Sequence, residues 1–123
     1  MPNKRTIDLL TESYKDQMTA RRKYELKKPN GELLKAIYFP PLTRFDRKKA
    51  QAAAGTDDAL TISTRLLCQI AENEDGSKAF ASADAENLQR FLPESVLNEL
   101  ELFMMDIQVD LDTAKNESSE ITG

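Results

Sequence analysis

The stretch that decides the fold is RKYELKKPNGELLKAIYF, residues 22–39. Apolar and charged residues alternate in its first half, and apolar residues dominate from Leu33 to Phe39. Between the halves, Pro29 has a φ angle suited to a turn, and Asn30-Gly31 can adopt positive φ. The pattern predicts a β-hairpin at about 22–39 that turns at these residues. A lone hairpin is barely stable in water, so we expect it to pack on helices.

Helical patterns flank the hairpin on both sides. Residues 5–19 carry apolar side chains at i, i+3 and i+7, which predicts a short amphipathic helix that must dock or fray. Pro40-Pro41 ends the second strand, and apolar residues at helical spacing follow. The predicted helices span residues 5–19, 44–54, 58–73, a short segment that Ser82 caps and Pro93 ends, and 93–110.

Polar residues mark where these helices begin. Thr43 with Asp46 three residues later is a loose capping box, and Gly55 can end the helix that they open. Thr6 is the candidate N-cap of the first helix. Asp57 or Asp58 opens the helix that follows Gly55.

The predicted fold class is mainly α with one β-hairpin (α+β), a small helical domain of about four to five helices. At 123 residues the chain is long enough for one modest core, and we expect a single domain over residues 1–111. Within it, residues 1–20 hold the N-terminal helix and residues 43–111 the helical part. Residues 112–123, DTAKNESSEITG, are almost free of apolar side chains and predict a flexible, disordered polar tail.

Apolar stripes indicate which helix faces are buried. The helix 93–110 carries one stripe predicted to be core: Leu97, Leu100, Met104, Ile107 and Leu111, backed by Val96 and Phe103. A second stripe lies nearly opposite: Leu102, Met105 and Val109. Either this helix is buried between two layers, or the second stripe meets another chain. The expected buried residues of the two preceding helices are Leu60, Leu67, Ile70, Ala85, Leu88, Phe91 and Leu92.

Charge is divided along the chain. Residues 1–50 hold 13 of the 17 Lys+Arg and 6 of the 21 Asp+Glu, a net charge of +7, and residues 51–123 carry −11. Such a chain can attract copies of itself head to tail, or hold a basic partner at one end and an acidic one at the other, so the division favours binding over catalysis. The candidate basic contact residues are Arg44, Arg47, Lys48 and Lys49. A solvated basic face explains these four residues equally well.

Composition argues against several functional classes. There is no histidine and only one cysteine, so the commonest general base, a Cys/His pair and a thiolate zinc cluster are all excluded. We therefore expect no enzyme, no cofactor and no metal site. Glu72, Glu74 and Asp75 lack the ligand spacing of a calcium loop, and Cys68 lies among apolar residues, as in a core. With no apolar run that spans a bilayer and no signal peptide, we expect a cytosolic protein without a membrane partner.

Several short motifs follow one another along the chain: Pro29-Asn30-Gly31-Glu32, Tyr38-Phe39-Pro40-Pro41-Leu42-Thr43, Asp46-Arg47, Leu66-Leu67, Asp75-Gly76, Asp84-Ala85-Glu86-Asn87-Leu88 and Leu92-Pro93-Glu94-Ser95-Val96-Leu97. Their order resembles that in the tail assembly chaperones of long-tailed, siphovirus-type bacteriophages, in their short form. The resemblance covers about residues 20–105 and rests on the arrangement of these motifs.

The resemblance implies a late phage protein that acts in the host cytoplasm and is absent from the mature virion. It implies binding to the long helical tape measure protein, which is kept soluble until tail tube subunits assemble around it. It also implies spiral self-assembly and a frameshifted long form that recruits the tube protein and diverges near residues 112–123. Two alternatives stay open: a small nucleic-acid-associated or regulatory module that uses the basic half, and a minor structural tail or connector protein.

Overall fold

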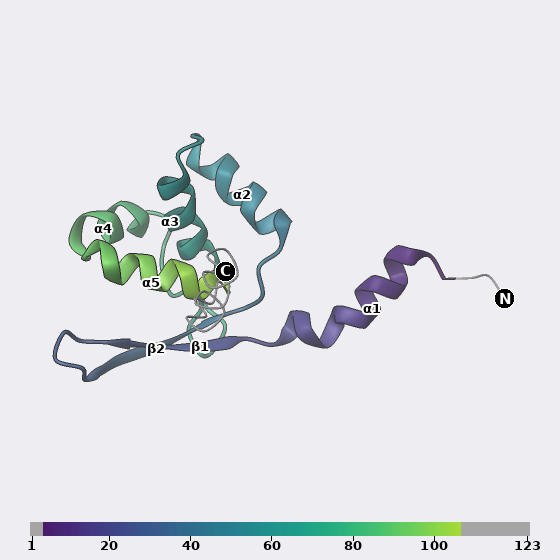
Figure 1. Ribbon diagram of the computed structural model, residues 1–123, viewed down its shortest axis with the longest axis horizontal. Helices are drawn as coiled ribbons and strands as arrows, with labels where there is room; N and C mark the ends of the chain where they lie inside the picture. Colours follow the sequence, from purple (N-terminus) through teal and green to yellow (C-terminus); the bar gives the residue numbers. More distant parts are fainter. Residues whose placement is uncertain (1–3, 107–123) are drawn as a thin grey trace, which may run out of the picture.

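The computed structural model describes residues 4–106 (Figure 1). Over these residues the chain forms five helices and one antiparallel hairpin, which confirms the predicted fold class. The elements are α1 (Thr6–Thr19), β1 (Arg22–Lys27), β2 (Leu33–Phe39), α2 (Arg44–Ala54), α3 (Ala59–Ile70), α4 (Asp84–Phe91) and α5 (Glu94–Met104). The predicted tail, 112–123, lies outside the described residues. Between residues 4 and 106, no helix is both long and apolar enough to cross a bilayer.

The hairpin forms where its turn chemistry predicted. Strands β1 and β2 pair antiparallel from Arg22 opposite Phe39 to Lys27 opposite Leu33. The Gly31 N–H donates to the Lys28 carbonyl at 2.9 Å, and Gly31 has a φ of +89°, which few other residues adopt without strain. Local turn geometry therefore sets the register of the hairpin.

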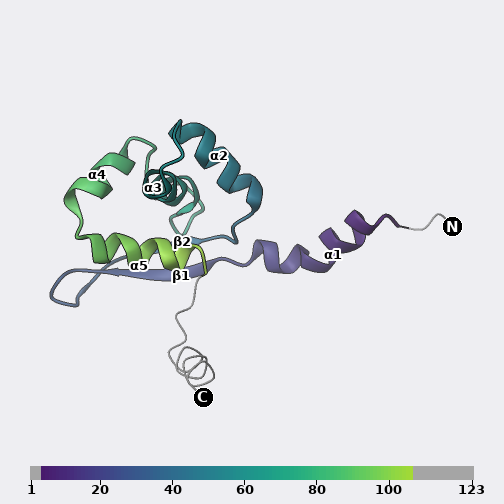
Figure 2. The same ribbon diagram turned by 45° about the horizontal axis from the view of Figure 1, so that its top comes forward.

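The core lies where the second strand meets the helices. Ile37 and Phe39, on one face of β2, are 1% and 0% exposed. They belong to one buried cluster with Leu67 of α3 and Leu100 and Met104 of α5. Helix α3 runs through the centre, with α2 on one side of it, α4 on the other and α5 between α3 and the hairpin (Figure 2). The hairpin thus gains from these helices the support that two strands cannot supply alone.

Both predicted boundaries of α2 are confirmed. The Asp46 N–H donates to the Thr43 hydroxyl at 3.1 Å, and the Thr43 N–H donates to the Asp46 carboxylate at 3.0 Å. Gly55 ends the helix with a φ of +66°. Asp58 caps α3 by accepting the Thr61 N–H at 3.0 Å.

Two predicted N-caps are wrong. Thr6 is the first residue of α1 and follows Arg5, which makes no side-chain capping bond. Ser82 does not cap α4, which begins after Ala83. The Asp84 carboxylate accepts the Ala81 N–H at 2.8 Å instead, because a carboxylate inside the first turn reaches back to the donors before it.

Helix α3 is shorter than predicted, because the chain after Ile70 extends and pairs with the sheet. Glu72 and Tyr38 of β2 exchange two backbone hydrogen bonds, at 2.8 and 2.9 Å. The sequence predicted that α3 continues to residue 73. An antiparallel bridge to β2 replaces that last helical turn.

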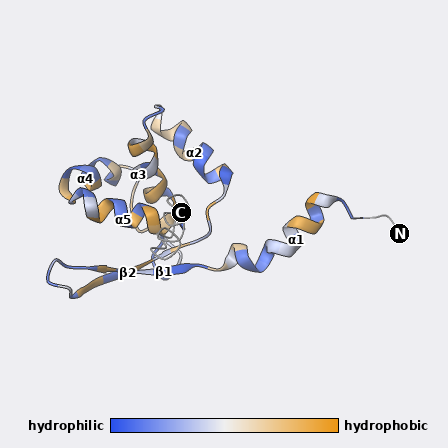
Figure 3. Cartoon of the chain, viewed as in Figure 1, coloured by the Kyte–Doolittle hydropathy of each residue, from blue (hydrophilic) through white to orange (hydrophobic). Residues whose placement is uncertain are grey.

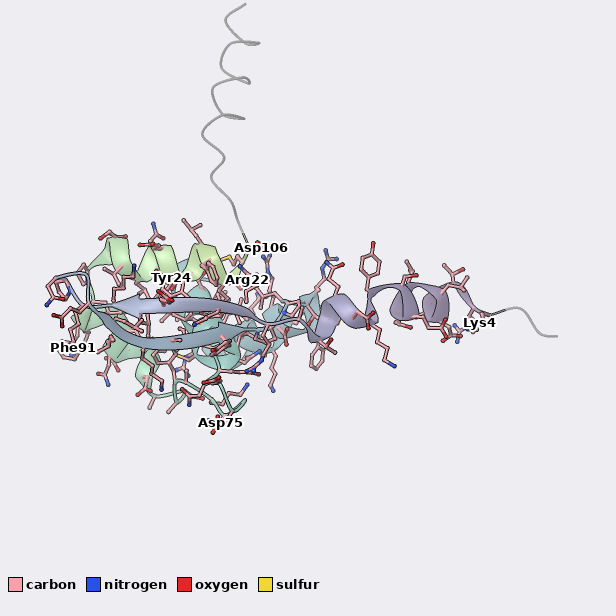
Figure 4. All side chains as sticks on the ribbon, turned by 90° about the horizontal axis from the view of Figure 1, so that it is seen from below. Lys4, Arg22, Tyr24, Asp75, Phe91 and Asp106 are labelled. Carbon is pink, nitrogen blue, oxygen red and sulfur yellow. The ribbon has the colours of Figure 1, made fainter. Side chains whose placement is uncertain are left out.

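Helix α5 also ends early, at Met104, so the prediction that it continues through residue 106 is wrong. The Arg22 guanidinium donates to the carbonyls of Phe103 at 2.6 Å and Met104 at 3.1 Å. It also lies 3.6 Å from the carboxylate of Asp106, whose φ is +57° (Figure 4). A cation on the last carbonyls stabilises a helix end, and Asp106 leaves the helical conformation. The predicted positions Ile107, Val109 and Leu111 lie outside the described residues.

Some residues predicted to be buried are exposed. Leu60 is 63% exposed, Phe91 76% and Val96 41%. At about 100° per residue, Phe91 lies roughly 120° around α4 from the buried Ala85. Leu60 lies in the first turn of α3 and does not belong to the buried cluster.

Candidate protein-binding surfaces

Helix α1 extends away from the other helices and buries no residue (Figure 1). At about 100° per residue the predicted stripe lies on one face of α1, and Figure 3 shows hydrophobic segments along this helix. Ile7, Leu10 and Tyr14 are 52%, 51% and 52% exposed. We call these three residues the α1 stripe. An apolar helical stripe without a cover marks a surface that gains free energy by binding another chain.

The other side of α1 is acidic. Asp8, Glu12 and Asp16 follow at intervals of four residues and lie across the helix from the α1 stripe. Lys4 pairs with Glu12 at 2.8 Å. Because its charges are confined to one side, α1 can bury the α1 stripe against a partner while the acidic side stays in water.

Helix α2 presents the predicted basic residues on the surface. Arg44, Arg47, Lys48 and Lys49 are all exposed, and none of them pairs with an acidic residue between residues 4 and 106. We call these four residues the basic face of α2. Phe45, which lies among them, is 73% exposed, so the surface combines positive charge with one aromatic anchor.

The structure separates the residues of the second predicted stripe. Leu102 is half-buried and borders a shallow hollow between β1 and α5, together with Tyr24 and Phe103. Met105 follows the end of α5 and packs against the central cluster. Val109 lies outside the described residues. Leu102 and Met105 therefore do not form one helical surface.

A groove that the sequence did not indicate lies between α3, α4 and α5. Its volume is about 380 Å³, and Leu60, Leu92 and Leu97 form its apolar lining. Three carboxylates also border it, those of Asp58, Glu94 and Glu101, and no lysine or arginine of the described range 4–106 does. We call this site the acidic groove.

Glu101 is the unusual residue of the acidic groove, because it is only 6% exposed. Its carboxylate accepts a hydrogen bond from the Thr64 hydroxyl at 2.9 Å and pairs with no cation between residues 4 and 106. Burial raises the pKa of Glu101, and the Thr64 hydrogen bond offsets part of that effect. Helical spacing could have indicated that Glu101 is buried. It lies four residues after Leu97 and three before Met104, and therefore on the core side of α5.

The acidic residues Glu72, Glu74 and Asp75 stabilise a turn. Glu72 pairs with Arg21 at 3.3 Å, and the same guanidinium donates to the Glu74 carbonyl at 3.0 Å. The Asp75 carboxylate accepts both the N–H and the hydroxyl of Ser77, at 2.9 and 2.6 Å, and these bonds lower the pKa of Asp75. These contacts hold a turn (Asp75, Figure 4).

Cys68 is a core residue, as its neighbours in the sequence predicted. It is 3% exposed, and burial raises its pKa to about 11. Because the thiolate is the reactive form, we expect folded protein at pH 8 to resist iodoacetamide for hours and to be alkylated fully in urea. Mass spectrometry measures both. Rapid alkylation of the folded protein would show that Cys68 is accessible.

The comparisons with known proteins bear on the fold of the chain. No protein-family model matches the chain, and no curated protein matches it. Among solved structures, the fold is similar to a phage tail assembly chaperone. That structure is the tail assembly chaperone of bacteriophage HK97, at 13% sequence identity and a TM-score of 0.47, over 81% of this chain and 97% of that chain. At this identity the similarity concerns the fold alone.

Proposed function

We propose that this chain is a non-enzymatic tail assembly chaperone of a long-tailed phage, which binds and solubilises the tape measure protein and helps to organise tail tube assembly. The observation that carries the proposal is the exposed α1 stripe on a helix that buries nothing of its own. The order of motifs over about residues 20–105, which resembles this family, supports it.

The chemistry of the α1 stripe suits a helical client. A long helical protein that has not yet assembled exposes apolar stripes, and two such stripes bury each other as helices pack side by side. The side chains of the α1 stripe are about half exposed, so each gains on the order of 1 kcal/mol when covered. Their sum of a few kcal/mol gives weak binding by one chaperone.

Weak single contacts fit a reversible role. Several chaperone copies along one rod-like client add their contacts, and each can leave without the others. Tail tube subunits can then replace them in turn. Under this proposal the protein works in the host cytoplasm and is absent from the mature virion, and a frameshifted long form recruits the tube protein. The region where the forms would diverge, 112–123, lies outside the described residues.

Co-expression with the tape measure protein of the same genome tests the function. The wild type should keep that protein in the soluble fraction and co-purify with it. When Ile7, Leu10 and Tyr14 are changed together to Gln, the tape measure protein should return to the insoluble fraction, because α1 remains helical but has lost its apolar stripe. The Tm of the chaperone should not change, since no residue of α1 is buried.

Leu9→Gln is the matched control. Leu9 is 51% exposed, as Leu10 is, but it lies on the other side of α1. It should leave client solubility unchanged. An equal loss of client solubility in both variants would mean that any exposed apolar residue of α1 contributes, whatever its face. Unchanged client solubility with the triple variant would reject the α1 stripe as the client site.

The basic face of α2 favours a second candidate, a module that binds nucleic acid. Lys and Arg side chains bind phosphates by releasing counterions, so such binding would be strongest at low salt. A gel shift with duplex DNA and with RNA at low salt tests this. Retardation that Lys48→Glu abolishes would support the second candidate. Mass spectrometry of purified particles tests a structural tail role.

A further inference from the structure

We propose that the outer edge of β1, together with the hollow between β1 and α5, binds an extended segment of another protein as a third strand. The segment that fits this site alternates apolar side chains with acidic ones. This inference goes beyond the client-binding function proposed above, which rests on α1, and it stands whether or not that function is confirmed.

Strand β1 offers backbone groups to a partner along its outer edge. Within residues 4–106 it pairs with β2 alone, and the bridge to Glu72 is made by β2 on its other side. Because Tyr38 exchanges hydrogen bonds with Glu72, its N–H and C=O point away from β1. Opposite residues of an antiparallel pair either bond each other or both turn away, so Lys23, opposite Tyr38, turns its N–H and C=O outward. Glu25, two residues on, does the same, and neither residue bonds to a backbone group outside the hairpin in the described range.

The hollow beside this edge can take side chains from an added strand. It has a volume of about 420 Å³ and an apolar floor of Tyr24, Leu102 and Phe103. The rings of Tyr24 and Phe103 meet edge-to-face, with centroids 4.9 Å apart, and so hold each other in place. Tyr24 stands between Lys23 and Glu25 on the half-buried face of β1, and β1 runs alongside α5 (Figure 4). Every second side chain of a strand beside β1 would therefore reach the hollow.

The charges of β1 indicate which kind of strand fits. Lys23, Glu25 and Lys27 are exposed on the face of β1 that points away from the helices, and no salt bridge within residues 4–106 engages them. Opposite charges that face each other across two strands stabilise a sheet, and like charges destabilise it. Acidic residues opposite the two lysines are therefore favoured, and they alternate with the apolar residues that reach the hollow.

The same charges oppose pairing between two copies of β1. In a symmetric antiparallel pair centred on Glu25, Lys23 of each copy would face Lys27 of the other, and the two Glu25 side chains would face each other. Lysines on an edge strand commonly prevent such pairing. They leave the edge open to an acidic strand, for which the backbone hydrogen bonds supply affinity and the hollow supplies selectivity.

A designed peptide tests the site on the full chain. Its sequence is Thr-Glu-Val-Thr-Val-Glu-Thr with both ends blocked, and its symmetry presents glutamates to Lys23 and Lys27 in either direction. In NMR spectra of isotope-labelled protein, the Lys23 and Glu25 amide signals should shift in a saturable way. The Kd should be about 1 mM, because few groups bind and the peptide must be ordered. The peptide Thr-Lys-Val-Thr-Val-Lys-Thr should bind about tenfold more weakly.

Amide hydrogen exchange shows whether the peptide binds as a strand. In the free protein the Lys23 and Glu25 N–H groups should exchange rapidly, whereas that of Tyr24, which bonds to Ile37 in β2, should be protected. Saturating peptide should slow exchange at Lys23 and Glu25 severalfold and leave Tyr24 unchanged. Protection of Lys23 and Glu25 in the free protein would overturn the inference, because the edge would then be paired already, by the chain itself or by another copy.

A charge exchange tests the role of the two lysines. Lys23→Glu combined with Lys27→Glu should weaken binding of the glutamate peptide about tenfold, and it should bind the lysine peptide instead. Lys15→Glu combined with Lys35→Glu is the matched control, because it changes the net charge equally at exposed positions, in α1 and on the other face of the hairpin. It should bind the glutamate peptide as the wild type does. Circular dichroism should show both variants to be folded, since all four lysines are exposed.

Three results would reject the β1 edge as a binding site. The first is the absence of any shift at millimolar peptide, and the second is a set of shifts that avoids both β1 and the hollow. The third is equal weakening by the two double variants, which would mean that the peptide responds to overall charge and not to this edge.

Discussion

Leu100→Asp should unfold the protein. Leu100 is 2% exposed and lies in the central cluster on α5. The change removes a buried leucine and places a carboxylate in the core next to Glu101, which is itself buried and pairs with no cation within residues 4–106. The lost leucine packing and the buried unpaired charge together should cost about 5 kcal/mol or more, which equals the whole stability of a marginally stable domain. Circular dichroism at 25 °C should show loss of the helical signal.

Leu34→Asp is the control for this change. Leu34 is 61% exposed in β2, so the same substitution there should cost less than about 1 kcal/mol. A Leu100→Asp protein with a cooperative transition within a few degrees of the wild type would show that α5 is not part of the core.

Phe39→Ala is the second large effect that we expect. Phe39 is 0% exposed at the end of β2, and its ring meets that of Phe103 edge-to-face, with centroids 5.6 Å apart. Truncation leaves a cavity and removes an aromatic contact, at a cost of about 3–5 kcal/mol. Urea unfolding followed by circular dichroism should show a lower midpoint with an unchanged slope.

Phe91→Ala provides the comparison for that loss. Phe91 is 76% exposed at the end of α4, so its removal should shift the urea midpoint little. Equal losses at positions 39 and 91 would mean that Phe91 is buried in solution, for example by another copy. Measurement at two protein concentrations distinguishes that case, because association makes stability depend on concentration.

Local chemistry made much of the fold predictable. The hairpin follows from Pro29 and Gly31, whose backbone preferences match the turn without help from the remainder of the chain. Helix α2 follows in the same way from the capping box of Thr43 and Asp46 and from Gly55. In each case the deciding contacts join residues close together in the sequence.

The ends of α3 and α5 were mispredicted because distant residues decide them. Glu72 leaves α3 to pair with Tyr38, and Arg22 of β1 satisfies the last carbonyls of α5. Apolar periodicity continues past the end of α5, and no Pro or Gly follows Ile70 before Gly76, so local sequence does not mark either end and the tertiary contacts decide both. The same limit applies to Phe91, whose apolar character did not reveal that α4 turns it outward.

The candidate binding surfaces divide in the same way. The exposure of the basic face of α2 follows from sequence alone, because four cationic side chains in one short helix remain in water. The amphipathic character of α1 also follows from its spacing. That α1 buries no residue against the remainder of 4–106, and that three helices place Glu101 in an acidic groove, depends on how the elements pack. Hydration and local backbone preferences act residue by residue, whereas a groove exists only once distant helices meet.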